Sequence, residues 1–196
     1  MNNDKRYIHS EKARRDMNQQ NTTPSPANRI YPGTLAFYHP NSSGSGSAVR
    51  FELKPAVGNR EGCFFMDMAR QRTSGGRDGN GGRRAATFDW QQKVTVKLGV
   101  SDVCSLLLVL RGRQEEAGNG KGLFHDTRDA TTVIRLRRGG TQFQGIALDV
   151  SRKAKRGEGE PVRIRIVLTE GEALGLETIF EHSMLLLVYG VLTPDY

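Results

Sequence analysis

The chain has 196 residues, enough for one domain of ordinary size with tails but not for two full domains. Its 29 Lys and Arg outnumber 21 Asp and Glu, which gives a formal net charge of +8 and favours a polyanionic partner. No stretch approaches the ~18 uninterrupted apolar residues of a membrane span, and the first residues lack the apolar core of a secretory signal. These features argue against a membrane protein and predict a soluble intracellular one, in the cytoplasm, the nucleoid or an organelle matrix.

One domain with two tails is the predicted organisation. Residues 1–30 are polar and aperiodic, which is typical of a disordered tail. Residues 31–192 are predicted to form the domain, and 193–196 a short second tail. The two cysteines, Cys63 and Cys104, lie in apolar runs and are expected to be small buried side chains rather than disulfide partners or metal ligands.

The first half of the domain consists of runs in which apolar and polar residues alternate. This pattern is typical of half-buried antiparallel strands. In the last run, Phe88, Trp90 and Val94 occupy even positions and polar residues lie between them, so Trp90 is expected to belong to the core. The predicted strands are 35–39, 49–54, 63–71 and 88–98.

A short apolar segment, 103–110, then predicts a helix. Ser101 can cap its start, Asp102 suits the first turn, and Gly112 lies just beyond its basic last turn. A buried strand is the alternative for so short a segment. The cap and the glycine favour the helix.

The second half repeats this layout with predicted strands at 122–125, 132–137, 143–151 and 162–168. Thr169 and Glu172 have the spacing of a capping box and open a predicted helix over 170–189. From Met184 onward this helix is apolar on all sides, which indicates a core helix between two sheets, a subunit interface, or both. We favour both. The fold class is therefore α+β, with four strands and a helix, twice over.

Cations recur on the outward faces of the predicted strands. Like charges on neighbouring strands repel one another unless a polyanion neutralises them. A solvated face is the ordinary alternative, but the cations occur on several strands with few acids among them, which favours nucleic acid. The candidate phosphate-binding residues are Arg50, Lys54, Lys93, Lys97, Arg135, Arg137, Arg152, Lys153, Arg163 and Arg165.

The loop 72–84 combines glycine with arginine. A flexible backbone with guanidinium groups suits contacts to phosphates and to base faces, although a plain hairpin linker has the same composition. Its candidate residues are Arg77, Arg83 and Arg84.

Two aromatic residues are out of phase with the neighbouring core positions. Tyr38 and Phe65 are therefore candidates for stacking on bases, which tolerates any sequence. Packing against the long helix or another subunit is the alternative for both. Phe143 is a weaker candidate, and Phe124 is expected to be packed.

Enzyme chemistry finds little support in this sequence. Residues 118–122 contain glycine and lysine without the spacing of a phosphate-binding loop. His125 and Asp126 are typical of a turn after a strand. The histidines lack metal-ligand spacing, and no nucleophile–base pair is suggested. We predict a non-catalytic protein without a cofactor or metal.

The chain resembles the Whirly family of single-stranded-DNA-binding proteins over residues 34–192. The short motifs that carry this resemblance, in the same order and with fitting gaps, are Phe-Asp-Trp at 88–90, the passage 93–103, Leu-Phe-His-Asp at 123–126, Leu-Asp-Val-Ser-Arg-Lys at 148–153, and the capped helix 169–189.

This resemblance implies two four-stranded antiparallel sheets, roughly perpendicular, with two helices. It also implies a homo-tetramer formed through the helices, with a dimer as the alternative, and bases stacked on aromatic side chains with little sequence preference. The family's lysine-rich motif corresponds to 46–51 here, and its lysines are missing. This departure argues against particles larger than a tetramer.

The sequence thus predicts a protein that binds single-stranded DNA in transcription regulation, repair or genome maintenance. Two alternatives remain open. The same surface suits an RNA-binding or annealing protein. An oligomeric scaffold that docks an acidic protein partner is the alternative from another class.

Overall fold

The computed structural model describes residues 34–191 except 78, 80, 141–142 and 158, so the predicted tails 1–30 and 193–196 lie outside the described residues. In its first half the described chain forms β1 (Thr34–His39), β2 (Ser47–Lys54), β3 (Cys63–Thr73), β4 (Gly76–Arg77), β5 (Arg83–Arg84), β6 (Thr87–Phe88), a 3₁₀ turn (Trp90–Gln92), β7 (Val94–Leu98) and α2 (Val100–Leu110). The second half forms β8 (Leu123–Asp126), β9 (Ala130–Arg138), β10 (Ile146–Ala154), β11 (Val162–Leu168) and α3 (Glu170–Tyr189).

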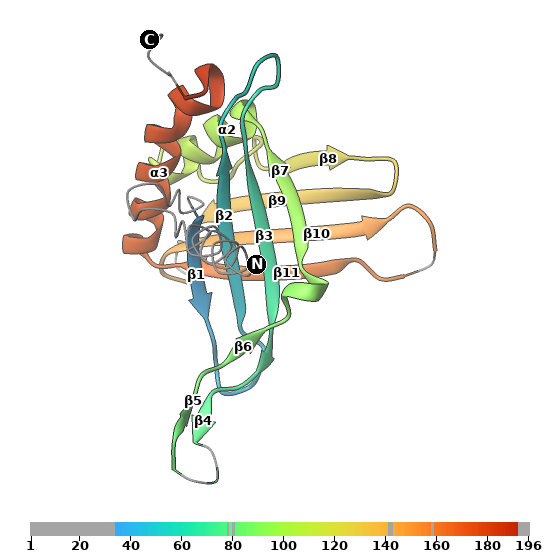
Figure 1. Ribbon diagram of the computed structural model, residues 1–196, viewed down its shortest axis with the longest axis vertical. Coiled ribbons are helices and arrows are strands. Elements are labelled where there is room, and N and C mark those ends of the chain that lie inside the picture. The colour runs from blue at the N-terminus through green and yellow to red at the C-terminus, as the bar shows by residue number, and fades with distance from the viewer. Residues whose placement is uncertain (1–33, 78, 80, 141–142, 158, 192–196) are drawn as a thin grey trace, which may run out of the picture. The chain divides into compact units, whose positions relative to one another are not determined.

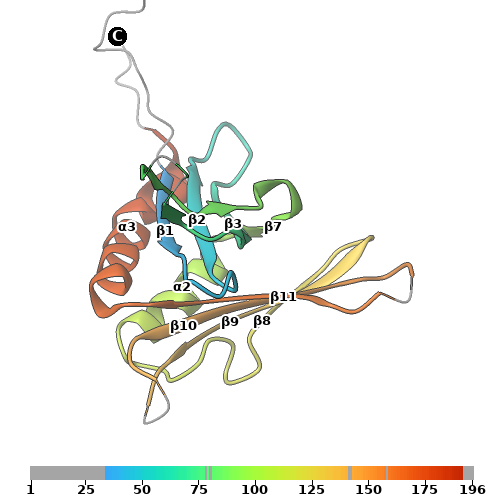
Figure 2. The same ribbon diagram turned by 90° about the horizontal axis from the view of Figure 1, so that it is seen from below.

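These strands build two antiparallel sheets that cross each other (Figures 1 and 2). The first sheet has the order β1-β2-β3-β7, and β6 pairs with the far end of β3. The second sheet has the order β11-β10-β9-β8, and β4 and β5 form a separate two-stranded ribbon. The prediction of an α+β fold with two roughly perpendicular sheets and two helices is confirmed.

Pleat alternation directs the apolar side chains into one core between the sheets and helices. Phe51 of β2 and Phe64 of β3 are 1% exposed, and both rings contact Phe180 of α3, with centroid separations of 5.5 and 5.0 Å. Figure 2 shows α2 between the two sheets, where it also packs against α3. The inner faces of the sheets thus form the core, and their outer faces are open to a partner.

Hydrogen bonds to the backbone of β11 join the second sheet to the first. Ser47 Oγ donates to the carbonyl oxygen of Arg165 at 2.5 Å, and Arg70 Nη2 donates to the carbonyl oxygen of Arg163 at 3.0 Å. The side chains of both β11 arginines are exposed. Both side chains lie on the outer face of the second sheet.

The two helices begin differently from each other. Helix α3 has the predicted capping box, in which Thr169 Oγ1 accepts from the Glu172 amide at 3.2 Å and the Glu172 carboxylate accepts from the Thr169 amide at 2.8 Å. The predicted Ser101 cap of α2 is wrong. Gly99 occupies the N-cap, and its amide donates to the Asp102 carboxylate at 2.9 Å, so an acid in the first turn performs the cap's function from inside the helix.

Helix α3 is covered on one side only, in the part of the chain that the structure describes. Its buried side includes Leu176, Phe180 and Leu187, whereas Leu174 and Leu185 are 64% and 68% exposed. The prediction of a helix clasped between two sheets is therefore wrong for the single chain. The described residues contain no helix that is both long and apolar enough to cross a membrane.

Two smaller predictions also differ from the structure. Cys63 is buried as expected, but Cys104 is exposed on α2, because the short helix turns that position away from its packed side. The strand predicted from residue 143 begins at Ile146.

Candidate functional site

Except for Arg152, the predicted site residues fall on three surfaces, one of which also carries Phe88 and Trp90, which were not predicted. The outer face of the first sheet, called the aromatic face, carries Tyr38, Arg50, Lys54, Phe65, Phe88, Trp90, Lys93 and Lys97. The outer face of the second sheet, called the arginine face, carries Arg135, Arg137, Lys153, Arg163 and Arg165. The ribbon of β4 and β5, called the arginine hairpin, carries Arg77, Arg83 and Arg84.

Three aromatic rings meet at one end of the aromatic face. The Tyr38 ring lies 5.5 Å from the Phe88 ring and 6.3 Å, edge-on, from the Trp90 ring. Tyr38 pairs with Ala48 across the ladder, and Ala48 pairs with Ala69, so short neighbouring side chains leave room for the rings. Tyr38 is 53% exposed, which makes its ring available for stacking on a planar ligand.

A 3₁₀ turn positions Trp90 on this face. The Asp89 carboxylate accepts from the Gln92 amide at 3.2 Å, and the Asp89 amide donates to the Arg70 carbonyl oxygen at 2.8 Å. The predicted continuous strand 88–98 is therefore wrong, because this turn breaks it and shifts Trp90 out of the core phase. Trp90 is half-buried, and the guanidinium carbon of Arg50 lies 4.7 Å from its ring centroid. The expectation that Trp90 belongs to the core is corrected accordingly.

Asp67 organises the cations beside the rings. Its Oδ2 accepts from Arg50 Nε at 2.8 Å and from Lys93 Nζ at 2.7 Å, and Thr95 donates to its other oxygen. Asp67 is only 4% exposed. Burial raises the pKa of Asp67, but hydrogen bonds from Lys93, Thr95 and Arg50 outweigh burial, so the pKa lies below its ordinary value. The carboxylate thus stays ionised and holds both cations in place.

The other half of the aromatic face is less constrained. Half-buried Phe65 pairs with Lys97 on one side and with Glu52 on the other, and Lys54 Nζ forms an ion pair with Glu52. Among the described residues Lys97 has no carboxylate partner. Burial raises the pKa of the neighbouring Cys63 thiol against the opposing effect of Lys97 and Lys54, so this thiol is protonated and takes no part in the charge of the face.

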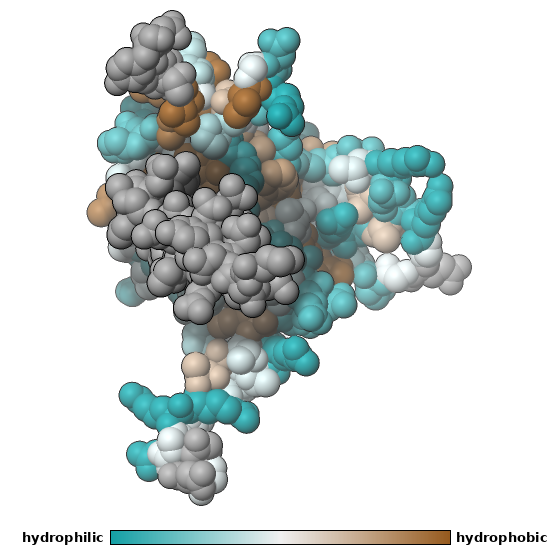
Figure 3. Space-filling model, in the orientation of Figure 1, coloured by the Kyte–Doolittle hydropathy of each residue, from teal (hydrophilic) through white to brown (hydrophobic). Residues whose placement is uncertain are grey.

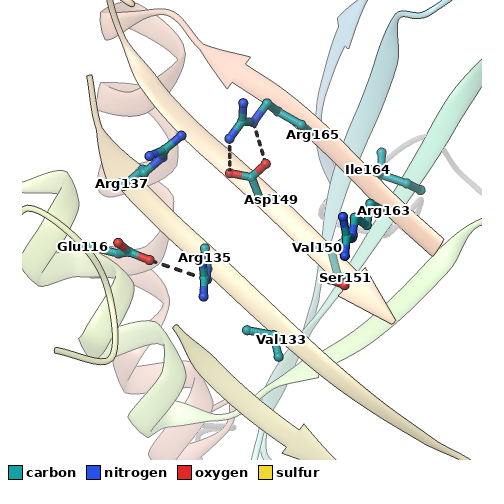
Figure 4. A pocket seen from close by; sticks show the side chains of 10 residues that line it. All are labelled: Glu116, Val133, Arg135, Arg137, Asp149, Val150, Ser151, Arg163, Ile164 and Arg165. Carbon is teal, nitrogen blue, oxygen red and sulfur yellow. Dashed lines mark hydrogen bonds and ion pairs between the residues drawn. The ribbon is translucent and has the colours of Figure 1, made fainter. Parts of the chain in front are cut away.

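The arginine face is hollowed and lined by four guanidinium groups (Figure 4). The hollow measures about 570 Å³. Ladder register places Asp149 of β10 between Arg165 of β11 and Arg135 of β9. Asp149 accepts from Arg165 Nε at 2.5 Å and from Nη2 at 3.2 Å, whereas Arg135 pairs with Glu116 at 3.6 Å.

Two other arginines of this face have no carboxylate partner in the described part of the chain. The Arg137 guanidinium carbon lies 5.6 Å from the ring of Phe143, and Arg163 is exposed beside Ser151. Together with exposed Lys153, which also has no described carboxylate partner, they are the charges of this face that are available to an anion. The expectation of few acids among the cations is wrong, because Asp67, Glu52, Asp149 and Glu116 each pair with one or two of them.

Two predictions about the second sheet are corrected. Arg152 alternates with Ser151 and Lys153, so it shares the face of Val150 and lies opposite Thr132, away from the other candidates. The prediction that Arg152 lies on the outer face did not follow this alternation of side chains along β10. Phe124, expected to be packed, is 67% exposed, because β8 is an edge strand and this position points outward.

The arginine hairpin projects from the far end of the first sheet (Figure 1), where Figure 3 shows hydrophilic side chains. Arg77, Arg83 and Arg84 are all exposed, and no described carboxylate pairs with them. A hollow of about 690 Å³ lies between the hairpin and the turn at 40–42.

Sequence reasoning missed Phe88 and Trp90 as members of the aromatic face. The available signal was Asp89 directly before Trp90, because Asp readily caps a turn through its own carboxylate. The described residues contain no group of three or more His, Cys, Asp or Glu side chains with the arrangement of a metal site.

Comparison with known proteins identifies the fold. No family model matches the chain, and no curated protein matches its sequence. WHY1 from Arabidopsis thaliana has a similar structure, with a TM-score of 0.62 and 16% identity over 80% of this chain and 85% of that chain. The plant transcriptional regulator PBF-2 follows with a TM-score of 0.56 and 19% identity over 79% and 81%.

Trypanosoma brucei MRP1/MRP2 also resembles the chain, with a TM-score of 0.51 and 15% identity over 79% of this chain and 92% of that chain. At such identities the likeness concerns the arrangement of helices and strands. Together with the two crossed sheets, these comparisons show that the chain has a distant Whirly-like fold.

Proposed function

We propose that this protein binds single-stranded nucleic acid, mainly DNA with little sequence preference, on the outer faces of its sheets. The observation that carries the proposal is the aromatic cluster of Tyr38, Phe88 and Trp90, with Arg50 held over Trp90 by Asp67. Unpaired bases stack on such rings regardless of sequence. In a duplex the bases already stack on each other, so the cluster favours single strands.

Phosphate contacts come from cations that have no carboxylate partner in the described structure. Lys97 supplies one on the aromatic face, and Arg137 and Arg163 supply two on the arginine face. Release of counterions from the phosphates drives such binding. The similarity to a plant transcriptional regulator supports a role in transcription regulation, and repair or genome maintenance uses the same binding chemistry.

Fluorescence anisotropy with matched oligonucleotides tests the proposal. We expect single-stranded DNA to bind at least tenfold more tightly than duplex DNA of the same length, with an affinity that falls as salt rises. Equal or stronger duplex binding contradicts the proposal. If a matched RNA strand binds more tightly than the DNA strand, RNA is the ligand instead. If no nucleic acid binds and protein partners remain bound after nuclease treatment, the scaffold alternative is supported.

The exposed side of α3 supports a second part of the proposal, a homo-tetramer formed through the helices. Leu174, Leu185 and Val188 are spaced to lie on one side of α3 and are 64%, 68% and 49% exposed. An apolar stripe of this kind is typical of a subunit interface. Leu185→Glu is expected to yield monomers in light scattering without loss of folding. If the wild type is a monomer, the proposed assembly is wrong. If the wild type is a dimer, the dimer replaces the tetramer as the assembly formed through the helices.

A further inference from the structure

The arginine hairpin concentrates positive charge on a very thin ribbon. Its ladder pairs Arg77 with Arg83 and Gly76 with Arg84. Arg77 and Arg83 therefore lie side by side on one face of the ribbon, and Arg84 lies on the opposite face. Like charges directly opposite each other destabilise a strand pair, and no described carboxylate offsets them. An anion beside Arg77 and Arg83 would relieve this repulsion.

The base of the hairpin is fixed to the sheet. The hydroxyl groups of Thr73 and Thr87 form a hydrogen bond of 2.8 Å. The Ser74 hydroxyl donates to the Ser42 carbonyl oxygen at 3.3 Å. Gln71, itself buried, accepts from the Asn41 amide at 2.9 Å. Both the hairpin and the 40–42 turn are thus held where they enclose the hollow described above.

Both walls of this hollow lie close in sequence to the aromatic cluster. Pro40 on one wall follows Tyr38 by two residues, and Arg84 on the other wall precedes Phe88 by four. A single-stranded nucleic acid whose bases stack on the cluster can therefore extend toward the hairpin. The hollow itself has no aromatic lining; besides the three arginines it is lined by Pro40, Asn41, Ser42, Gly75, Gly76, Ala85 and Ala86.

A lining without rings suits phosphates rather than unstacked bases. In a duplex the bases stack on each other and two rows of phosphates flank each groove. A narrow ribbon with cations on both faces matches two such rows. Single-stranded nucleic acid presents one row only and does not match this arrangement.

We propose that the arginine hairpin binds the double-stranded part of a nucleic acid whose single-stranded part lies on the aromatic face. The protein then recognises junctions between single and double strands. This inference rests on the proposed function, because the single-stranded part needs the aromatic cluster.

The experiment compares three DNA ligands by anisotropy: a single strand, a blunt duplex, and a duplex that carries the same single strand as a tail. The test variant is Arg77→Ala/Arg83→Ala/Arg84→Ala. The control variant, Arg113→Ala/Lys121→Ala/Arg128→Ala, removes the same charge from exposed positions elsewhere. Far-ultraviolet circular dichroism confirms that all proteins are folded.

Wild type and control are expected to bind the tailed duplex about tenfold more tightly than the single strand, and the hairpin variant to lose this advantage while keeping single-strand affinity within about twofold. Its salt slope on the tailed duplex is expected to fall by about 2 to 3. A wild type without preference for the tailed duplex overturns the inference, and so does equal loss on the single strand. Failure of wild type to bind the single strand while the hairpin variant still loses duplex binding refutes the proposed function instead.

Discussion

The two outer faces of this protein carry similar numbers of cations, but within the described chain most of those on the aromatic face are paired with carboxylates, whereas most of those on the arginine face are not. On the aromatic face, Arg50 and Lys93 are held by the buried carboxylate of Asp67 beside three rings. On the arginine face, Arg137 and Arg163 have no carboxylate partner among the described residues, and Asp149 serves Arg165 alone. The first face is built around π surfaces and the second around charge.

This difference indicates how the two faces divide the work of binding. Stacking depends on the ring area offered to a base and only weakly on salt, whereas phosphate contacts weaken as salt rises. Net charge alone does not reveal this division, because a paired cation counts the same as an unpaired one. The following experiments test it from the largest expected effect to the smallest.

The largest effect is expected for stability, from Asp67→Asn. The variant leaves Arg50 and Lys93 close together without the buried charge that holds them, so we expect a loss of about 3 kcal/mol in the free energy of unfolding. The matched change on the other face, Asp149→Asn, breaks an exposed pair and should cost about 1 kcal/mol or less. Urea unfolding measures both. Equal losses would show that the two carboxylates are equivalent.

Removal of the exposed ring by Tyr38→Ala should weaken single-stranded DNA binding by about tenfold, because one base loses its stacking partner. The dependence of affinity on salt should stay unchanged, since no charge is removed. Phe124→Ala removes a still more exposed ring from the second sheet and should change the affinity by less than about twofold. Anisotropy titrations over a range of salt concentrations measure both variants, and a larger effect of Phe124→Ala would reverse the assignment of stacking.

The charge of the arginine face is tested with Arg137→Gln/Arg163→Gln. We expect the slope of log affinity against log salt to fall by about 1.4 for a single strand, or about 0.7 for each phosphate that the variant no longer neutralises. Affinity at high salt should change little. An unchanged slope would mean that the phosphates do not reach this face.

The smallest effect concerns acid. The pKa of Asp67 in the folded protein is lower than in the unfolded chain, because its hydrogen bonds outweigh burial. Its contribution to stability is therefore complete above the ordinary value near pH 4 and is lost as the pH falls through the lowered folded value. Between pH 7 and pH 3 the wild type should lose more stability than Asp67→Asn. Parallel loss in both proteins, measured by urea unfolding at each pH, would contradict this.

Much of the fold was predictable because its signals are local. Alternation along 49–54 and 63–71 identifies β2 and β3, and the capping pair Thr169 and Glu172 marks the start of α3. The organisation of the candidate site was not predictable in the same way. Asp67 lies opposite Arg50 on the neighbouring strand and binds Lys93, which comes 26 residues later in the chain. The local sequence around each residue does not determine which residues of neighbouring strands lie opposite each other. The prediction that Trp90 belongs to the core was wrong for the opposite reason. The local apolar alternation continues through Trp90, although the backbone turns there and ends the strand.

The clamp that Asp67 places on Arg50 has a thermodynamic consequence for the aromatic face. An arginine fixed by a carboxylate and a ring has already lost its rotamer entropy during folding, whereas a free side chain such as Arg163 loses about 0.5–1.5 kcal/mol when a ligand immobilises it. The aromatic face is therefore preorganised. Its binding should carry a smaller entropic penalty than its modest free charge suggests.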